Sequence, residues 1–259
     1  MTRRYSRLFV ALLLPLALTA AFLSAATIRA GSPDICATCT YSTIQEALDD
    51  DATIGTTLVL GAETFLENVE ITRPIILVGA GPGLTIIDGQ MIGPVITING
   101  GVTVSLSGVT LQNGDASSVD GGGVLNQGGI VSLSNSVVAN NMAPNGAGIA
   151  NDAAGQMTSD HVIVRDDVAD ELIDDISVCS DCAGGGILNF GVMTITNSTV
   201  HGNSALVGGG IENGSLATLI ATNIEVYGNT AVNNTGNPDD GTGGGIENIG
   251  TFTLTNSIV

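Results

Sequence analysis

The chain contains no tryptophan, and phenylalanine and tyrosine bring its aromatic content to only 3% of 259 residues. Glycine, in contrast, occurs 36 times. Aromatic side chains supply much of the buried area in ordinary globular cores, so a core of that kind is disfavoured. We expect small residues to pack in closely stacked layers, which the absence of a Cβ on glycine permits.

Positive charge is scarce as well. The chain has no lysine, and six arginines face 25 acidic residues, which gives a formal net charge of −19. Such a surface repels nucleic-acid phosphates and anionic lipids, so neither is expected as a partner. Cations, calcium foremost, are its natural counterions. The alternative is that the acidity provides only solubility.

The N-terminus has the order of a secretory signal peptide over residues 1–30. Three arginines within the first seven residues precede an apolar run, Leu8–Leu23, and small residues follow. Cleavage after Ala26 or after Ala30 fits equally well. An uncleaved membrane anchor is the alternative, which Pro15 disfavours. No later stretch is apolar for long enough to span a bilayer, so we expect a secreted, extracellular or cell-surface protein without membrane insertion after signal removal.

A glycine-rich phrase recurs along the second half of the chain. The basic unit is about 24 or 25 residues long, with insertions near 166–183 and 233–242. Apolar residues alternate over short segments within each unit, which predicts short strands. One unit cannot bury its own apolar face, so the units are expected to stack as a solenoid. The phrases are GGGVLNQGG from Gly121, GAGIANDAAG from Gly146, GGGILNFG from Gly184, GGGIENGS from Gly208 and GGGIENIG from Gly243.

Asparagines recur at two places in this unit. Stacked in register, identical amides can hydrogen-bond along the column as asparagine ladders. Asp160 is aligned with the second place, where it would weaken the ladder, and His161 is aligned with Ser136 and Ser198. The first place is occupied by Asn126, Asn151, Asn189, Asn213 and Asn248, and the second by Asn135, Asn197, Asn223 and Asn256.

One helix is expected, within residues 41–51, before the repeats begin. Ser42 with Gln45, or Thr43 with Glu46, forms a capping box at its start. Since an open solenoid end exposes apolar residues and strand edges, the helix is expected to cap that end. Its apolar face consists of Ile44, Ala47 and Leu48.

The segments YSTIQEAL, GAETFLENVEI, PIILVGAG and TIIDG between residues 41 and 89 resemble the opening of pectin-lyase-like proteins, including pectin methylesterases. The GGGIxN and TNSxVxGN units resemble repeats of bacterial β-helix surface proteins and, more loosely, of chlamydial polymorphic outer-membrane proteins. The resemblance covers residues 36–259. It implies an all-β fold, a right-handed single-stranded parallel β-helix (solenoid) with a short N-terminal capping helix. The cap would span residues 31–57, and the β-helix residues 58–259 with an open or truncated C-terminal end.

This fold carries lyases, hydrolases, esterases and inert adhesins, so it does not assign a function. The catalytic segments of pectin methylesterases and polygalacturonases are absent apart from bare Asp-Asp pairs. Arg165, beside Asp166 and Asp167, is the one candidate for a lyase base. It is aligned with Ala139, His201 and Tyr227, an outward position of ordinary variability. We therefore expect no catalytic residue and no cofactor-binding residue.

The first insertion is unusually acidic. Carboxylates packed this closely repel one another unless a cation neutralises them or solvent disperses them. A calcium site and a plain acidic loop are both open, and the spacing matches neither an EF-hand nor an RTX nonapeptide. The candidate calcium ligands are Asp166, Asp167, Asp170, Glu171, Asp174 and Asp175.

The four cysteines form two C-x-x-C pairs, Cys36 with Cys39 and Cys179 with Cys182. Twice C-x-x-C is also the spacing of a zinc site. In an exported solenoid, however, four or five coils of about 4.8 Å would hold the pairs roughly 20 Å apart. Two local disulfides are therefore predicted.

These observations favour a non-catalytic secreted or cell-surface scaffold for adhesion or for carbohydrate or ligand binding. Its expected partner is an extracellular polysaccharide or surface ligand. The alternative is a pectin-lyase-like polysaccharide-degrading enzyme, acting as a lyase, hydrolase or esterase.

Overall fold

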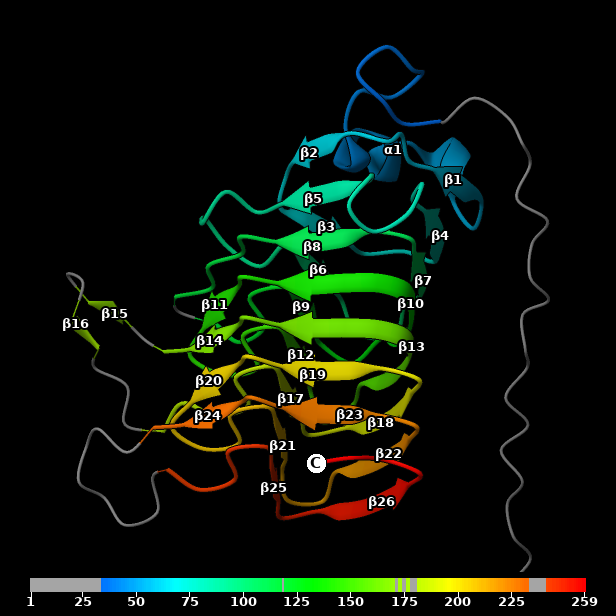
Figure 1. Ribbon diagram of the computed structural model, residues 1–259. Helices are drawn as coiled ribbons and strands as arrows, with labels where there is room; N and C mark the ends of the chain where they lie inside the picture. The colour runs from blue at the N-terminus through cyan, green and yellow to red at the C-terminus, as the bar shows by residue number, and fades with distance from the viewer. Residues whose placement is uncertain (1–33, 118, 171, 174–175, 178–180, 233–240) are drawn as a thin grey trace, which may run out of the picture. The chain divides into compact units, whose positions relative to one another are not determined.

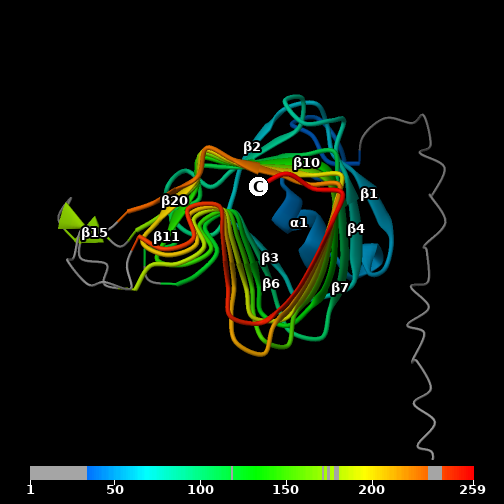
Figure 2. The same ribbon diagram turned by 60° about the horizontal axis from the view of Figure 1, so that its bottom comes forward.

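Short parallel strands stack into a right-handed parallel β-helix, seen from the side in Figure 1 and nearly along its axis in Figure 2. The computed structural model confirms the expected fold. No helix in the part of the chain that it describes is long and apolar enough to cross a membrane. The structure describes residues 34–117, 119–170, 172–173, 176–177, 181–232 and 241–259.

Three sheet faces surround the core. The first face contains β1 (Thr57–Val59), β4 (Ile75–Val78), β7 (Thr103–Ser107), the first halves of β10 (Ile130–Ala139) and β13 (Gln156–Arg165), β18 (Val192–Thr196), β22 (Thr218–Thr222) and β26 (Thr251–Thr255). The second face contains β2 (Thr64–Leu66), β5 (Ile86–Asp88), β8 (Thr110–Gln112), the second halves of β10 and β13, β19 (Thr199–His201) and β23 (Glu225–Tyr227). The third face contains β3 (Val69–Ile71), β6 (Ile96–Ile98), β9 (Val124–Asn126), β12 (Ile149–Asn151), β17 (Ile187–Asn189), β21 (Ile211–Asn213) and β25 (Ile246–Asn248).

A smaller parallel sheet lies beside the three faces, as Figure 2 shows at the left. It consists of β11 (Met142–Ala143), β14 (Val168–Ala169), β20 (Ser204–Ala205) and β24 (Thr230–Ala231). Beyond β14, an antiparallel pair is formed by β15 (Leu172–Ile173) and β16 (Ile176–Ser177).

Equivalent residues of successive coils pair in register, so like side chains stack into columns. Ile149, Ile187 and Ile211 pair in this way on the third face, and each is buried. Alternation places every second side chain of a strand inside, as in β13 and β18. The short apolar pattern of each unit therefore builds one continuous core along the helix.

The first predicted asparagine ladder is present, and all of its members except Asn248 are buried. Asn126, Asn151, Asn189, Asn213 and Asn248 are joined by four amide-to-amide hydrogen bonds, each 2.8 Å long. The same amides close the turn that follows the third face: Gly129 N donates to Asn126 Oδ1 at 2.8 Å, for example. The side chains of four ladder residues therefore both join coils and close their own turns: Asn126, Asn151, Asn189 and Asn248.

The glycine triplets serve two needs. The first glycine of each phrase has a positive φ, 76° at Gly121 and 60° at Gly208, which side-chain-bearing residues rarely adopt. In the first phrase the second glycine has no room for a side chain, because a Cβ on Gly122 would lie 2.4 Å from the carbonyl oxygen of Met142; the second phrase has Ala147 at this place. The triplet thus permits a close turn into the third face.

The N-terminal end is covered as expected by α1 (Ile44–Asp49), followed by the short 3-10 helix η1 (Asp51–Thr53). Thr43 is the N-cap and accepts from Glu46 N at 3.1 Å, while the Glu46 carboxylate returns to Ser42 N at 3.0 Å. Ile44, Ala47 and Leu48 are buried. At the other end of the helix, Arg73 Nη2 donates to the Ala47 carbonyl oxygen at 2.9 Å.

Candidate functional site

The second face gathers side-chain types that are rare in this chain. Arg165, His201 and Tyr227 stand at the ends of β13, β19 and β23, and the strand register pairs Arg165 with His201 and His201 with Tyr227. We call these three residues the cation–aromatic column. The alignment predicted from the sequence is confirmed, but their combination into one surface feature was not foreseen.

The two rings of the column are stacked. The centroids of His201 and Tyr227 lie 5.0 Å apart with an interplanar angle of 2°. Tyr227 is 53% exposed, and Arg165 forms an ion pair with Asp166 at the following turn. A parallel β-helix holds these side chains about 4.8 Å apart per coil, so the column is set by the backbone ladder.

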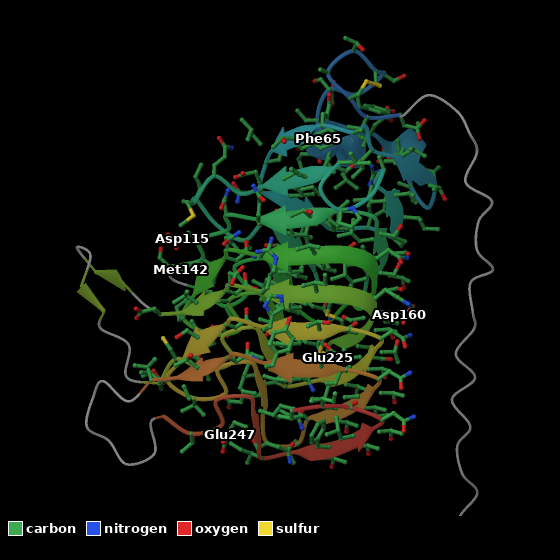
Figure 3. The ribbon with its side chains drawn as sticks, viewed as in Figure 1. Phe65, Asp115, Met142, Asp160, Glu225 and Glu247 are labelled. Atoms are coloured by element: carbon green, nitrogen blue, oxygen red, sulfur yellow. A yellow bond between two sulfur atoms is a disulfide. The ribbon has the colours of Figure 1, made fainter. Side chains whose placement is uncertain are left out.

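A second column lies beside the first on the same strands. Ile163, Thr199 and Glu225 occupy it in register, and Ile163 and Glu225 are exposed. Figure 3 shows Glu225 on this face, which is turned toward the viewer. The two columns together offer two stacked aromatic rings, an apolar side chain, a hydroxyl, a carboxylate and a guanidinium.

At the corner between the first and second faces, the structure corrects the predicted alignment of Asp160 with the second asparagine position. Asp160 pairs with Ser134 and Thr196, so His161, and not Asp160, occupies the place of Asn135 and Asn197. His161 adopts the left-handed conformation required there, with φ 55°. The predicted alignment was wrong by one residue.

The register of β13 was hard to predict for a physical reason. At the inward position where β10 has Leu133 and β18 has Ile195, β13 has Ser159. The apolar residue that marks the core side is therefore missing from the sequence. Val162 consequently pairs with Ser136.

Asp160 lies at this corner (Figure 3) and has three side-chain partners. Thr196 Oγ1 donates to it at 2.6 Å and Asn197 Nδ2 at 2.8 Å, and His161 Nδ1 lies 2.9 Å from its other oxygen. Burial raises the pKa of Asp160, but these hydrogen bonds outweigh it and hold the pKa below its ordinary value. The second ladder continues from Asn223 Nδ2 to Asn197 Oδ1 at 3.2 Å.

A third ladder, which the sequence analysis missed, runs beneath the turns after the second face. It consists of Asn141, Asp167, Asn203 and Asn229. Each side-chain Oδ1 accepts from a backbone N–H of the preceding coil, as in Asn141 N to Asp167 Oδ1 at 2.8 Å and Asp167 N to Asn203 Oδ1 at 3.0 Å. The available signal was an asparagine after glycine or asparagine at the close of three second-face strands, β10, β19 and β23.

Asp167 is the one acid in this ladder. It is fully buried, and its Oδ2 has no hydrogen-bond partner among the described residues. Burial raises the pKa of Asp167 well above its ordinary value, and the two hydrogen bonds from Asn141 oppose this only in part. Asp167 therefore faces the interior of the helix, not a solvent-exposed cation.

The six candidate calcium ligands are thus divided. Asp166 is exposed and paired with Arg165, Asp167 is buried in the third ladder, and Asp170 is partly buried. Within the described residues no group of three or more His, Cys, Asp or Glu side chains is placed to hold a metal ion. Glu171, Asp174 and Asp175 lie outside the described residues, so the calcium site stays a prediction.

The cysteines agree with local pairing where the structure describes them. Cys36 and Cys39 form a disulfide with Cα atoms 4.9 Å apart. Cys182 is buried and also disulfide-bonded, while Cys179 lies outside the described residues. Because Cys36 and Cys39 bond each other, a disulfide between the two C-x-x-C motifs is not formed.

A pair of glutamates stands apart from the column, on the outer side of the third face. Glu212 and Glu247 pair in register at places where earlier coils have Leu125, Ala150 and Leu188. Glu212 is only 8% exposed, and its Oε2 has no hydrogen-bond partner among the described residues. Burial and then repulsion by Glu247 raise the pKa of Glu212 to about 7.

This raised pKa makes stability depend on pH. Between the ordinary pKa of 4.5 and about 7, the unfolded chain has lost the Glu212 proton that the folded chain retains. Raising the pH through this window therefore favours unfolding. We expect Glu212→Gln to reduce the difference in unfolding free energy between pH 5 and pH 8 by on the order of 1 kcal/mol.

Urea denaturation at both pH values measures this difference. The control is Glu225→Gln, which changes an exposed glutamate and should leave the difference as in the wild type. If the difference in unfolding free energy between pH 5 and pH 8 is the same in both variants, Glu212 does not titrate in this window.

No protein-family model matches the chain, and a search of curated proteins finds no similar sequence. A function is therefore proposed from the surfaces described above.

Proposed function

We propose that the protein is a non-catalytic, exported β-helix scaffold that binds an extracellular carbohydrate or a similar surface ligand. The observation that carries the proposal is the cation–aromatic column, with Tyr227 half exposed and stacked on His201. Tyr and Arg are enriched at binding hot spots because they combine large contact areas with directed hydrogen bonds. A sugar ring presents C–H faces to aromatic rings and hydroxyls to Arg165 and Glu225.

The charge of the chain favours a neutral ligand. With 25 acidic against six basic residues, polyuronates such as pectate are repelled at long range, whereas neutral glycans are not. The arginine of the column is already neutralised by Asp166. A neutral polysaccharide or glycan is therefore the partner that this face suits.

Export is part of the proposal. The arrangement of arginines, apolar run and small residues at the N-terminus is that of a secretory signal. The Cys36–Cys39 disulfide fits an oxidising compartment, because cytosolic disulfides are rare. The likeness of the opening coils to pectin-lyase-like proteins points the same way.

The competing proposal, a polysaccharide lyase, depends on Arg165 as the base. Its guanidinium is paired with Asp166, and the neighbouring Asp167 is turned into the third ladder. A lyase of this type would need surface carboxylates beside the base to hold calcium and a uronate substrate. The described geometry supports binding better than this chemistry.

The binding proposal is tested with immobilised neutral polysaccharides and a glycan array. We expect the full chain to be retained by a neutral glycan and Tyr227→Ala to weaken retention by about tenfold or more, as for a hot-spot residue. Phe190→Ala is the matched control, because Phe190 is an exposed aromatic at a turn after the third face. Equal retention of both variants would rule out the column as the binding site.

A further inference from the structure

From β7 to β26, most outward side chains of the first face are short and carry a hydroxyl. Eighteen outward positions lie on β7, β10, β13, β18, β22 and β26, and thirteen of them are serine or threonine. We call these eighteen positions the hydroxyl face. The hydroxyl residues are Thr103, Ser105, Ser107, Ser132, Ser134, Thr158, Thr194, Thr196, Thr218, Thr222, Thr251, Thr253 and Thr255; the others are Ile130, Gln156, Asp160, Val192 and Ile220.

The strand register arranges these positions in a grid. Ser105, Ser132, Thr158 and Thr194 pair in succession across β7, β10, β13 and β18, and the columns on either side do the same. Neighbouring coils lie about 4.8 Å apart, and outward residues of one strand repeat at about 6.7 Å. The hydroxyl face is therefore a two-dimensional lattice of three columns on a backbone fixed by continuous parallel ladders. In the column of Thr103 the hydroxyls are interrupted by Ile130, Gln156 and Val192.

Strand propensity accounts for part of this composition only. Threonine, which occupies nine of the thirteen positions, is a good strand former, but serine, at the other four, is not. The second face, on the same coils, does carry Arg165, His201, Glu225 and Tyr227. The hydroxyl face carries no aromatic and no basic residue at any of its eighteen positions.

Acidic residues are also nearly absent from it, although the chain has 25 of them. The one acid, Asp160, is at the corner and engaged by Thr196, Asn197 and His161. A neutral face on a strongly acidic molecule suits a neutral partner. A charged group would instead hold its own hydration shell and keep a solid surface at a distance.

We propose that the hydroxyl face adsorbs to ice. Water oxygens in ice repeat in two directions at spacings close to those of this grid, so hydroxyls held on a rigid sheet can occupy positions of the lattice. The threonine methyl groups between these hydroxyls displace water. Because they form no hydrogen bonds, they do not orient the neighbouring water molecules in a way that competes with the ice lattice. A crystalline polysaccharide fits less well, because short side chains without aromatic rings offer nothing to stack on a sugar face.

The inference is independent of the proposed carbohydrate site, which lies on the second face. It is tested by thermal hysteresis and by partition of the labelled full chain into a growing ice hemisphere. We expect the wild type to show both, and Thr194→Tyr, in the middle of the grid, to lose most of both. Thr230→Tyr places the same side chain at an exposed position of β24 in the smaller sheet and should retain both.

Circular dichroism and melting of both variants establish that they are folded. Absence of hysteresis and of ice partition in the wild type would overturn the proposal, as would equal losses in the two variants. Retention on crystalline cellulose or chitin through this face, without an effect on ice, would assign it to another occupant and also overturn it. Loss of glycan binding in Tyr227→Ala with unchanged ice activity separates the two surfaces.

Discussion

Asn189→Ala should lower the free energy of unfolding by about 3 kcal/mol or more, because each buried polar group left without a hydrogen-bond partner costs about 1–3 kcal/mol. Asn189 is fully buried and accepts from Asn151 Nδ2 at 2.8 Å and from Gly191 N at 3.2 Å. Its own amide donates to Asn213 Oδ1 at 2.8 Å and to the Thr218 carbonyl oxygen at 3.1 Å. Alanine leaves these groups without partners and without access to water.

Urea denaturation of the full chain measures this loss. The control is Asn223→Gly in the second ladder, where the side chain is exposed and glycine tolerates the left-handed φ of 55°. Its amide makes a hydrogen bond of 3.2 Å to Asn197, and its removal should cost about 1 kcal/mol or less. Similar losses in both variants would contradict the view that the buried ladder holds the coils together.

Asp167→Asn should raise the free energy of unfolding at neutral pH by about 1–3 kcal/mol, the cost of an unsatisfied buried polar group. Asp167 Oδ1 already accepts from Asn141, but Oδ2 has no partner among the described residues. In the next coil, Asn203 Nδ2 donates to the Val164 carbonyl oxygen and to Asn229 Oδ1. An asparagine at 167 should make the equivalent hydrogen bonds and complete the third ladder.

The gain should also depend on pH. Because the folded chain raises the pKa of Asp167, wild-type stability falls as the pH rises above the ordinary carboxyl pKa, and the asparagine variant lacks this fall. Denaturation at pH 4 and pH 8 should therefore show a larger gain at pH 8. Asp166→Asn, at the adjacent exposed position, serves as the control and should have little effect. A gain of equal size at both pH values would mean that Asp167 does not titrate as the structure implies.

The fold was predictable because its signals are local and repeated. Similar units place Asn126, Asn151 and Asn189 at one position of the repeat. The repeat length then predicts that equivalent residues of successive coils pair with each other. The capping helix carries its own start signal in Thr43 and Glu46. Each of these features is fixed by nearby residues, so the sequence contains what is needed to infer it.

Features set by the register of a single strand were less predictable. Ser159 replaces the core residue of its coil, so the sequence did not reveal that His161 stands at the corner. The third ladder was missed because Asp167 looks like part of an acidic surface loop until its burial is known. The stacking of His201 on Tyr227 similarly depends on side-chain orientation, which alignment of repeats does not give.

Recovery of the ligand after binding shows whether the protein binds a surface ligand without transforming it. The full chain is incubated with neutral polysaccharides and with pectin, polygalacturonate and alginate, and both the retained protein and the polymer ends are measured. We predict retention on a neutral polysaccharide, loss of retention in Tyr227→Ala, and polymer of unchanged length. New reducing or unsaturated ends in any of these polymers would contradict the account and establish an enzyme.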